Sequence, residues 1–195
     1  MSTGVIVAIV IGVVVVIALI AVLAAVAKRR RKSQELQEHY GPEYDRELER
    51  TGSKKDAESK LEERQERRSQ LDIQPLDPQA RNRYAESWRT MQARFVDDPE
   101  NSVRESHRLV GEVMGERGYP VGDDFDRQAE DVSVDHPEVA SNYRSANEIS
   151  QRNDRGEAST EDLRQALVHY RSLFDELLDS GSGEQQHQQQ QQTTR

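Results

Sequence analysis

The side chains best suited to binding or catalysis lie beside two proline-containing turns. Tyr119 and Pro120 follow a glycine, and Asp135 and His136 stand directly before another proline. A phenol, a carboxylate and an imidazole in loops are residue types from which ligand-binding and catalytic sites are built. These four residues are therefore the candidate site if the protein binds a small molecule or is an unrecognised enzyme.

The histidines do not show a metal-binding spacing. They are His39, His107, His136, His169 and His187. None belongs to a Glu-x-x-His or His-Glu-x-x-His pattern, which would place metal ligands on one helix face. His136 follows an aspartate at a predicted helix start, where an aspartate is expected as a cap. We expect a structural or surface role for each histidine, with His136 exposed.

Other catalytic patterns are absent from the sequence. There is no glycine-rich phosphate loop, no Gly-x-Ser-x-Gly turn and no Ser-x-x-Lys motif. The chain also lacks cysteine, which excludes disulfides, zinc-thiolate sites and cysteine nucleophiles. The sequence therefore predicts no catalytic, cofactor-binding or metal-binding residue and no cofactor, which favours a non-enzymatic role.

The distribution of charge argues against nucleic acid as a partner. Residues 1–32 contain no acidic side chain, whereas residues 33–195 carry 22 basic and 36 acidic side chains. Proteins bind DNA and RNA largely by neutralising phosphates with lysine and arginine. An acidic domain of this kind repels a nucleic acid.

An apolar run at the N-terminus predicts a single transmembrane helix. All 23 residues from Val5 to Ala27 are apolar except Gly12, and as a helix they would span roughly 35 Å. The basic cluster that follows predicts a single-pass protein of the cell membrane with its C-terminal part in the cytoplasm, and also predicts contact with anionic lipid headgroups. That cluster consists of Lys28, Arg29, Arg30, Arg31 and Lys32.

Two further interpretations of this segment remain open. Ala25-Val26-Ala27 resembles a signal-peptidase site, so the run could instead be a cleaved signal. Its length, the lack of basic residues before it and the basic cluster after it favour an anchor. Gly4, Ala8 and Gly12 lie four residues apart, which permits weak self-association through one helix face.

Residues 33–79 predict a charged helical stalk. Helices are expected at 33–40, 42–50 and 53–71, with breaks at Gly41-Pro42 and Thr51-Gly52. The composition is dominated by charged residues and glutamine, with acid–base pairs four residues apart and too few apolar residues for a sustained coiled-coil seam. The stalk is thus coiled-coil-like only in its helical, charged character.

Residues 80–179 predict a small all-α bundle of four long helices and one short one. Apolar residues recur at helical spacing, and no strand pattern is present. Residues 180–195 are rich in glycine, serine and glutamine, which predicts a disordered tail. The predicted core comprises Tyr84, Trp88, Met91, Phe95, Leu163, Leu167, Tyr170 and Phe174.

Several short stretches of the sequence together resemble those of a known family. They include Tyr40-Gly-Pro-Glu-Tyr-Asp45, Ala93-Arg-Phe-Val-Asp-Asp-Pro99, Arg117-Gly-Tyr-Pro-Val121, Val134-Asp-His-Pro137 and the stretch from Ser159 to Arg171. The chain is in this respect similar to uncharacterised membrane-anchored or secreted bacterial proteins, mainly from actinobacteria. The resemblance covers most of residues 36–178 and implies a helical domain behind a membrane anchor, but it implies no catalytic residue.

Two functions are compatible with these features. The first is a protein-interaction or scaffolding module at the membrane, with a protein partner. The second is a membrane-tethered domain that binds a small molecule or is an unrecognised enzyme. The lack of a recognisable reaction centre favours the first.

Overall fold

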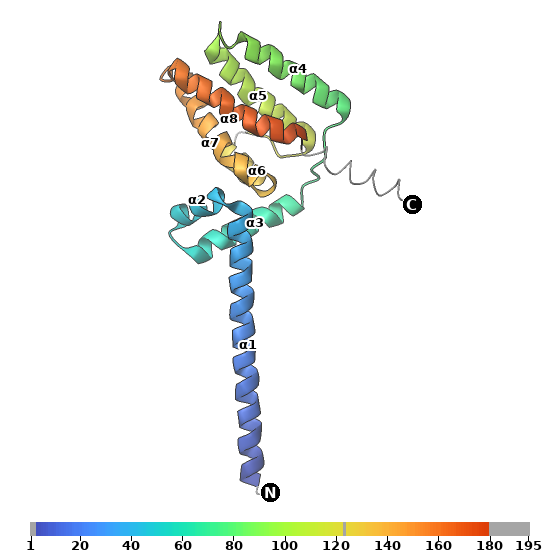
Figure 1. Ribbon diagram of the computed structural model, residues 1–195, viewed down its shortest axis with the longest axis vertical. Helices are drawn as coiled ribbons and strands as arrows, with labels where there is room; N and C mark the ends of the chain where they lie inside the picture. Colours follow the sequence, from blue (N-terminus) through green and yellow to red (C-terminus); the bar gives the residue numbers. More distant parts are fainter. Residues whose placement is uncertain (1–2, 123, 180–195) are drawn as a thin grey trace, which may run out of the picture. The chain divides into compact units, whose positions relative to one another are not determined.

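A computed structural model describes residues 3–122 and 124–179, apart from the side chains of residues 3, 5–11, 13–16 and 18. Within that part of the chain the secondary structure is entirely α-helical, which confirms the predicted all-α class for the described residues. The helices are α1 (Thr3–Tyr40), α2 (Pro42–Thr51), α3 (Lys54–Ser69), α4 (Pro78–Arg94), α5 (Pro99–Arg117), α6 (Phe125–Asp135), α7 (Pro137–Asp154) and α8 (Thr160–Asp179) (Figure 1).

Local capping chemistry explains where these helices begin and end. The carboxylate of Asp77 accepts hydrogen bonds from the backbone N–H groups of Gln79 and Ala80, both at 2.8 Å, and Pro78 takes the first helical position. At the end of α5, Gly118 adopts a φ of 98°. A Cβ at this position would lie 2.4 Å from the carbonyl oxygen of Asp72, so only glycine fits.

The predicted transmembrane helix is wrong. No helix in the described part of the chain is both long and apolar enough to cross a membrane. Val5 to Ala27 lies within α1, which runs from Thr3 to Tyr40. The transmembrane and single-pass assignments are corrected accordingly.

The structure describes only some of the residues for which a basic cluster, a small-residue helix face and a disordered tail are predicted. The basic cluster from Lys28 to Lys32 is helical and exposed. Gly4 and Gly12 have open space where a Cβ would be, whereas the side chain of Ala8 lies outside the described residues. The predicted disordered tail also lies outside them, since the description ends at Asp179.

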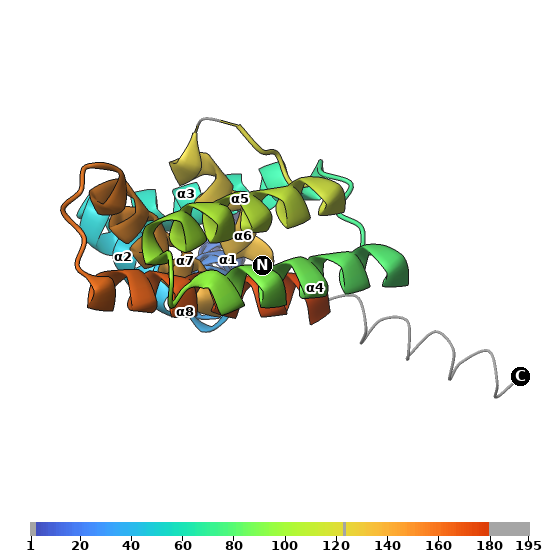
Figure 2. The ribbon, with the colours of Figure 1, turned by 90° about the horizontal axis from the view of Figure 1, so that it is seen from above.

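The chain divides into two compact units between His39 and Tyr40. In the second unit α4 packs on α5, α5 on α8, α8 on α7, and α7 on α6 (Figures 1 and 2). The long C-terminal helix α8 thus lies between α5 and α7. Residues 80–179 contain four long helices and the shorter α6, the number and type that the sequence predicts.

The main core lies between these five helices. Trp88, Met91, Leu163, Leu167, Tyr170 and Phe174 are buried in it. Tyr84 and Phe95 are only partly buried and pack against it. The ring of Trp88 on α4 stacks on that of Phe174 on α8, with centroids 4.5 Å apart, so this pair joins the two helices.

Helices α2 and α3 form a hairpin that packs against α6 and α7 (Figure 1). Tyr44 and Leu61 are buried in it, and the hydroxyl of Tyr40 donates to the carbonyl oxygen of Leu61 at 3.3 Å. This part of the chain was predicted as a separate stalk that keeps the bundle at a distance. In the structure α2 and α3 instead belong to the second unit, where they contact α6 and α7.

These contacts predict that the hairpin stabilises the bundle. A fragment of residues 80–179 would leave Glu130, Asp131 and Arg144 without ionic partners that the hairpin supplies. We expect it to unfold at least on the order of 3 kcal/mol more easily than a fragment of residues 40–179. Urea denaturation followed by circular dichroism measures the difference. Equal midpoints for both fragments would mean that the hairpin is only a spacer.

Candidate functional site

The most concentrated chemistry in the described residues is a buried network of charges between the hairpin and the bundle. Helices α2 and α3 meet α6 and α7 through carboxylates and guanidinium groups rather than through apolar side chains alone. The buried members are Glu43 and Glu47 of α2, Arg64 of α3, Asp131 of α6 and Arg144 of α7. Arg67 and Glu130 lie at its partly exposed edge.

Glu43 lies between two arginines. It accepts hydrogen bonds from Nε and Nη2 of Arg144, both at 3.2 Å, in the paired geometry that suits a guanidinium and a carboxylate. Nη1 of Arg64 lies 3.6 Å from the same carboxylate. This nitrogen is buried and makes no hydrogen bond to the described residues. Its ionic contact is with the Glu43 carboxylate.

Arg64 and Arg67 extend the network from α3 to α6. Nη2 of Arg64 donates to Glu47 at 2.5 Å and to Glu130 at 3.2 Å. Arg67 donates to Glu130 at 2.8 Å and to Asp131 at 3.4 Å. Each carboxylate therefore faces at least one guanidinium, which offsets the cost of removing these charges from water.

The pKa values of two carboxyls reflect this balance in opposite ways. Burial alone would raise the pKa of Glu47, but the hydrogen bond from Arg50 and the charge of Arg64 outweigh burial and hold the pKa below its ordinary value. For Asp131 burial prevails over the attraction of Arg67, and the pKa is raised. The arginines around Glu47 thus favour its ionised form, whereas burial favours the protonated form of Asp131.

The candidate residues Tyr119 and Asp135 do meet in space. The phenol of Tyr119 donates to Oδ2 of Asp135 at 2.6 Å, and Nε of Arg68 donates to the same oxygen at 2.5 Å. Burial and the neighbouring carboxylate raise the pKa of Tyr119, so the phenol stays protonated and serves as a donor. Pro120 is exposed and makes no contribution to this contact. The cluster connects α3, α6 and the turn after α5.

His136 is buried, so the expectation that it is exposed was wrong. It is 7% exposed, and its Nδ1 lies 3.2 Å from a carboxylate oxygen of Glu176 on α8. Its Nε2 is buried without a hydrogen-bond partner among the described residues. Burial and the Arg117 cation lower the pKa of His136, against the opposite influence of Glu176 and Asp135. A neutral imidazole that is closed off from solvent cannot act on a substrate without movement of the helices.

His107 has a similar environment in the core. Its Nδ1 lies 2.9 Å from the hydroxyl of Tyr170, which is also 2.9 Å from Oγ of Ser150. Burial lowers the pKa of His107. Both histidines therefore resist protonation in the folded state. No group of three or more possible metal ligands occurs in the described part of the chain.

These two histidines predict that acid weakens the fold. The unfolded chain takes up a proton on each near pH 6.5, whereas the folded chain does so only at lower pH. Stability is therefore complete above about pH 6.5 and falls below it, by at most about 1.4 kcal/mol per pH unit for each histidine. Urea denaturation between neutral pH and about pH 5 measures the slope.

Histidine variants test whether His107 and His136 cause the change of stability with pH. We expect His107→Gln and His136→Gln each to reduce it, whereas the same change at the partly exposed His169 leaves it unaltered. A wild-type slope in the His107→Gln, His136→Gln double variant would contradict this assignment.

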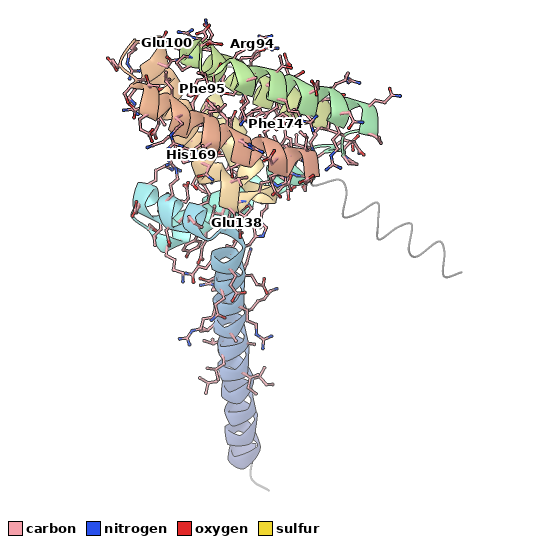
Figure 3. All side chains as sticks on the ribbon, turned by 45° about the horizontal axis from the view of Figure 1, so that its top comes forward. Arg94, Phe95, Glu100, Glu138, His169 and Phe174 are labelled. Atoms are coloured by element: carbon pink, nitrogen blue, oxygen red, sulfur yellow. The ribbon has the colours of Figure 1, made fainter. Side chains whose placement is uncertain are left out.

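An open groove lies along α7 and α8, outside these buried clusters. It has a volume of about 630 Å³, and His169 lies on its α8 side (Figure 3). The other lining residues are Ser145, Glu148, Ile149, Gln151, Arg152, Arg155 and Gln165. Sequence reasoning did not identify this groove, because its polar residues follow the ordinary pattern of a solvated helix face.

The described residues thus provide a buried ionic network, two histidines with lowered pKa values, and an open groove lined on one side by His169. The resemblance to the actinobacterial family stays a prediction, and it adds no residue role to any of these sites. Comparison of the chain with protein-family models, with curated proteins and with solved structures gave no match.

Proposed function

We propose that the second unit is a protein-interaction module that binds an acidic, extended segment of a partner protein in the α7–α8 groove. The observation that supports this proposal is the guanidinium pair on the groove, Arg152 and Arg155, in a chain with 36 acidic and 27 basic side chains. The groove lining holds these two guanidinium groups and one carboxylate, that of Glu148, and this excess of positive charge on an acidic protein favours an acidic partner segment.

Both arginines are available to a partner. Arg152 binds Asp162 at 3.0 Å and Arg155 binds Glu157 at 2.8 Å, but the arginine side chains are 41% and 54% exposed. Ion pairs of this exposure contribute only about 0–1 kcal/mol, so a partner's carboxylates can replace the internal ones at little cost.

The remaining lining of the groove suits an extended backbone. Gln151 and Gln165 carry amides that can both donate and accept, as a peptide backbone requires. Ile149, which is 7% exposed, lines the groove and adds a small apolar contact. Polar side chains that surround a few apolar contacts are typical of a transient interface.

Site-directed cross-linking tests the proposal. A photo-reactive amino acid at Gln165 in the full-length chain should cross-link the partner in the native cell, and mass spectrometry should locate the cross-link in an acidic segment. The corresponding synthetic peptide should then bind the purified chain. The double variant Arg152→Gln, Arg155→Gln should weaken this binding at least about tenfold, because two charge-assisted contacts are lost.

The matched control removes the same charge elsewhere. Arg89 on α4 and Arg108 on α5 are exposed and form ion pairs with neighbours on their own helices. Their double replacement by glutamine should leave peptide binding unchanged. A cross-link to a basic or apolar segment, or equal binding by the two double variants, would exclude the proposed interaction.

A further inference from the structure

A second pocket lies where the hairpin meets the start of α6 and the middle of α7. Its volume is about 340 Å³, near the lower end of the range for small-molecule sites. It is lined by Arg46 of α2, by Asp124, Phe125 and Asp126 at the start of α6, and by Arg144, Asn147, Glu148 and Gln151 of α7. It therefore combines two guanidinium groups, three carboxylates, two amides and an aromatic ring.

Asn147 is the first sign that this pocket is built for a ligand. Its side chain is 92% buried, being 8% exposed, and it lines the pocket. Its amide makes no hydrogen bond to any described residue, although its atoms are not fully enclosed. A buried amide is normally paired, so one that faces a pocket without a partner leaves a donor and an acceptor for a bound molecule.

The two arginines leave donors in the same pocket. Glu43 occupies Nε and Nη2 of Arg144, whereas Nη1 lies 3.7 Å from Asp126 and so beyond hydrogen-bond distance. The side chain of Asp126 is 86% exposed and can move aside. Arg46 is exposed and forms no ion pair within the described chain. A carboxylate on a ligand can therefore bind Arg46 and Nη1 of Arg144 together.

The carboxylates of the pocket restrict which charged groups the ligand can have besides its own carboxylate. Glu43 already neutralises Arg144, so Arg46 alone faces Asp124, Asp126 and Glu148. A simple carboxylate would be repelled by this excess of negative charge, whereas a simple amine would leave the donors of Arg46 and of Nη1 of Arg144 without an acceptor. A molecule with both charges satisfies both sides. The half-buried ring of Phe125 adds an apolar wall beside the charged groups.

We propose that this α2–α6–α7 pocket binds a small dipolar molecule of the amino-acid class. Its carboxylate binds Arg46 and Nη1 of Arg144, its protonated amine binds Glu148, and the amide of Asn147 fixes its orientation. The pocket adjoins the α7–α8 groove and shares Glu148 and Gln151 with it. Its cationic residues are different, so Arg46→Gln tests this pocket separately from the arginines of the groove.

Thermal unfolding of the full-length chain with each standard amino acid at millimolar concentration tests the proposal. At least one should raise the melting temperature, because a ligand that binds only the folded state stabilises it. Titration calorimetry then compares that amino acid with its analogue lacking the amine and its analogue lacking the carboxylate. Both analogues should bind at least about tenfold more weakly, since each loses one charge-assisted contact.

A matched pair of variants locates the site. Arg46→Gln should weaken binding at least about tenfold and leave the melting temperature without ligand unchanged, because Arg46 has no ionic partner in the described residues to lose. Arg89→Gln on α4 should bind as the unaltered chain does. The proposal is overturned if no amino acid raises the melting temperature, if either analogue binds equally well, or if Arg46→Gln binds with unchanged affinity.

Discussion

Replacement of Glu43 by glutamine is expected to lower the free energy of unfolding by about 3–5 kcal/mol, because it removes one partner from a buried ionic network. Glu43 is 1% exposed and faces the guanidinium groups of Arg144 and Arg64. A neutral amide of nearly the same shape leaves no cavity, so the loss measures the removal of this carboxylate charge from Arg144 and Arg64. Arg64 keeps its ion pairs with Glu47 and Glu130. Urea denaturation at neutral pH, followed by circular dichroism, gives the value.

Two further variants separate this effect from a general loss of charge. Glu63 is 53% exposed and pairs with Lys60 at 2.8 Å and with Arg67 at 3.6 Å, so Glu63→Gln should cost far less than Glu43→Gln. The double variant Glu43→Gln, Arg144→Gln should cost less than the sum of its two single variants, because it removes both members of one pair. Equal losses for Glu43→Gln and Glu63→Gln would show that the network contributes no more than a surface pair.

Truncation of Trp88 to alanine is the second change with a large expected effect. The side chain is 4% exposed and stacks on Phe174, so its removal leaves a cavity between α4 and α8. Truncation of a buried tryptophan typically costs about 3–5 kcal/mol, and domains of this kind are usually stable by only about 5–15 kcal/mol. We expect a large fall in the urea midpoint, measured in the same way as for Glu43.

The indole nitrogen provides a sharp control for this prediction. Nε1 of Trp88 is buried without a hydrogen-bond partner in the described part of the chain, so Trp88→Phe loses volume but no hydrogen bond. It should therefore cost clearly less than Trp88→Ala. Val96→Ala, at a position that is 88% exposed, should change stability by less than about 0.5 kcal/mol. A wild-type midpoint for Trp88→Ala would mean that this apolar face is not core.

The positions and the inward faces of the helices could be predicted from the sequence because both depend on neighbours a few residues away. Asp77 with Pro78 starts α4, and Gly118 ends α5, through contacts with the adjacent backbone. The helical spacing of Trp88 and Met91 places both on one face, and both are buried. The predicted membrane span rested on the length of the apolar run and on the basic cluster after it, and the described helices do not support it.

The sites were decided by the tertiary structure. Glu43 and Arg144 are 101 residues apart in the chain, yet they form the paired hydrogen bonds at the centre of the ionic network. Residues 33–79 have the composition of a solvated charged helix, and the same composition serves a buried face once complementary charges arrive from α6 and α7. Nothing in the local sequence distinguishes a charged helix that is solvated from one whose charges are buried against another helix.

His136 and the two pockets illustrate the same limit. A histidine at a helix start is exposed or buried according to what packs over it, and here α8 brings Glu176 to its ring. The α2–α6–α7 pocket likewise requires Arg46 and Asn147, from distant segments, to line one cavity. The sequence determines helical periodicity and capping because these act over one or two turns. Burial of charge and the shape of a pocket depend on long-range partners, and only the folded arrangement of the helices supplies them.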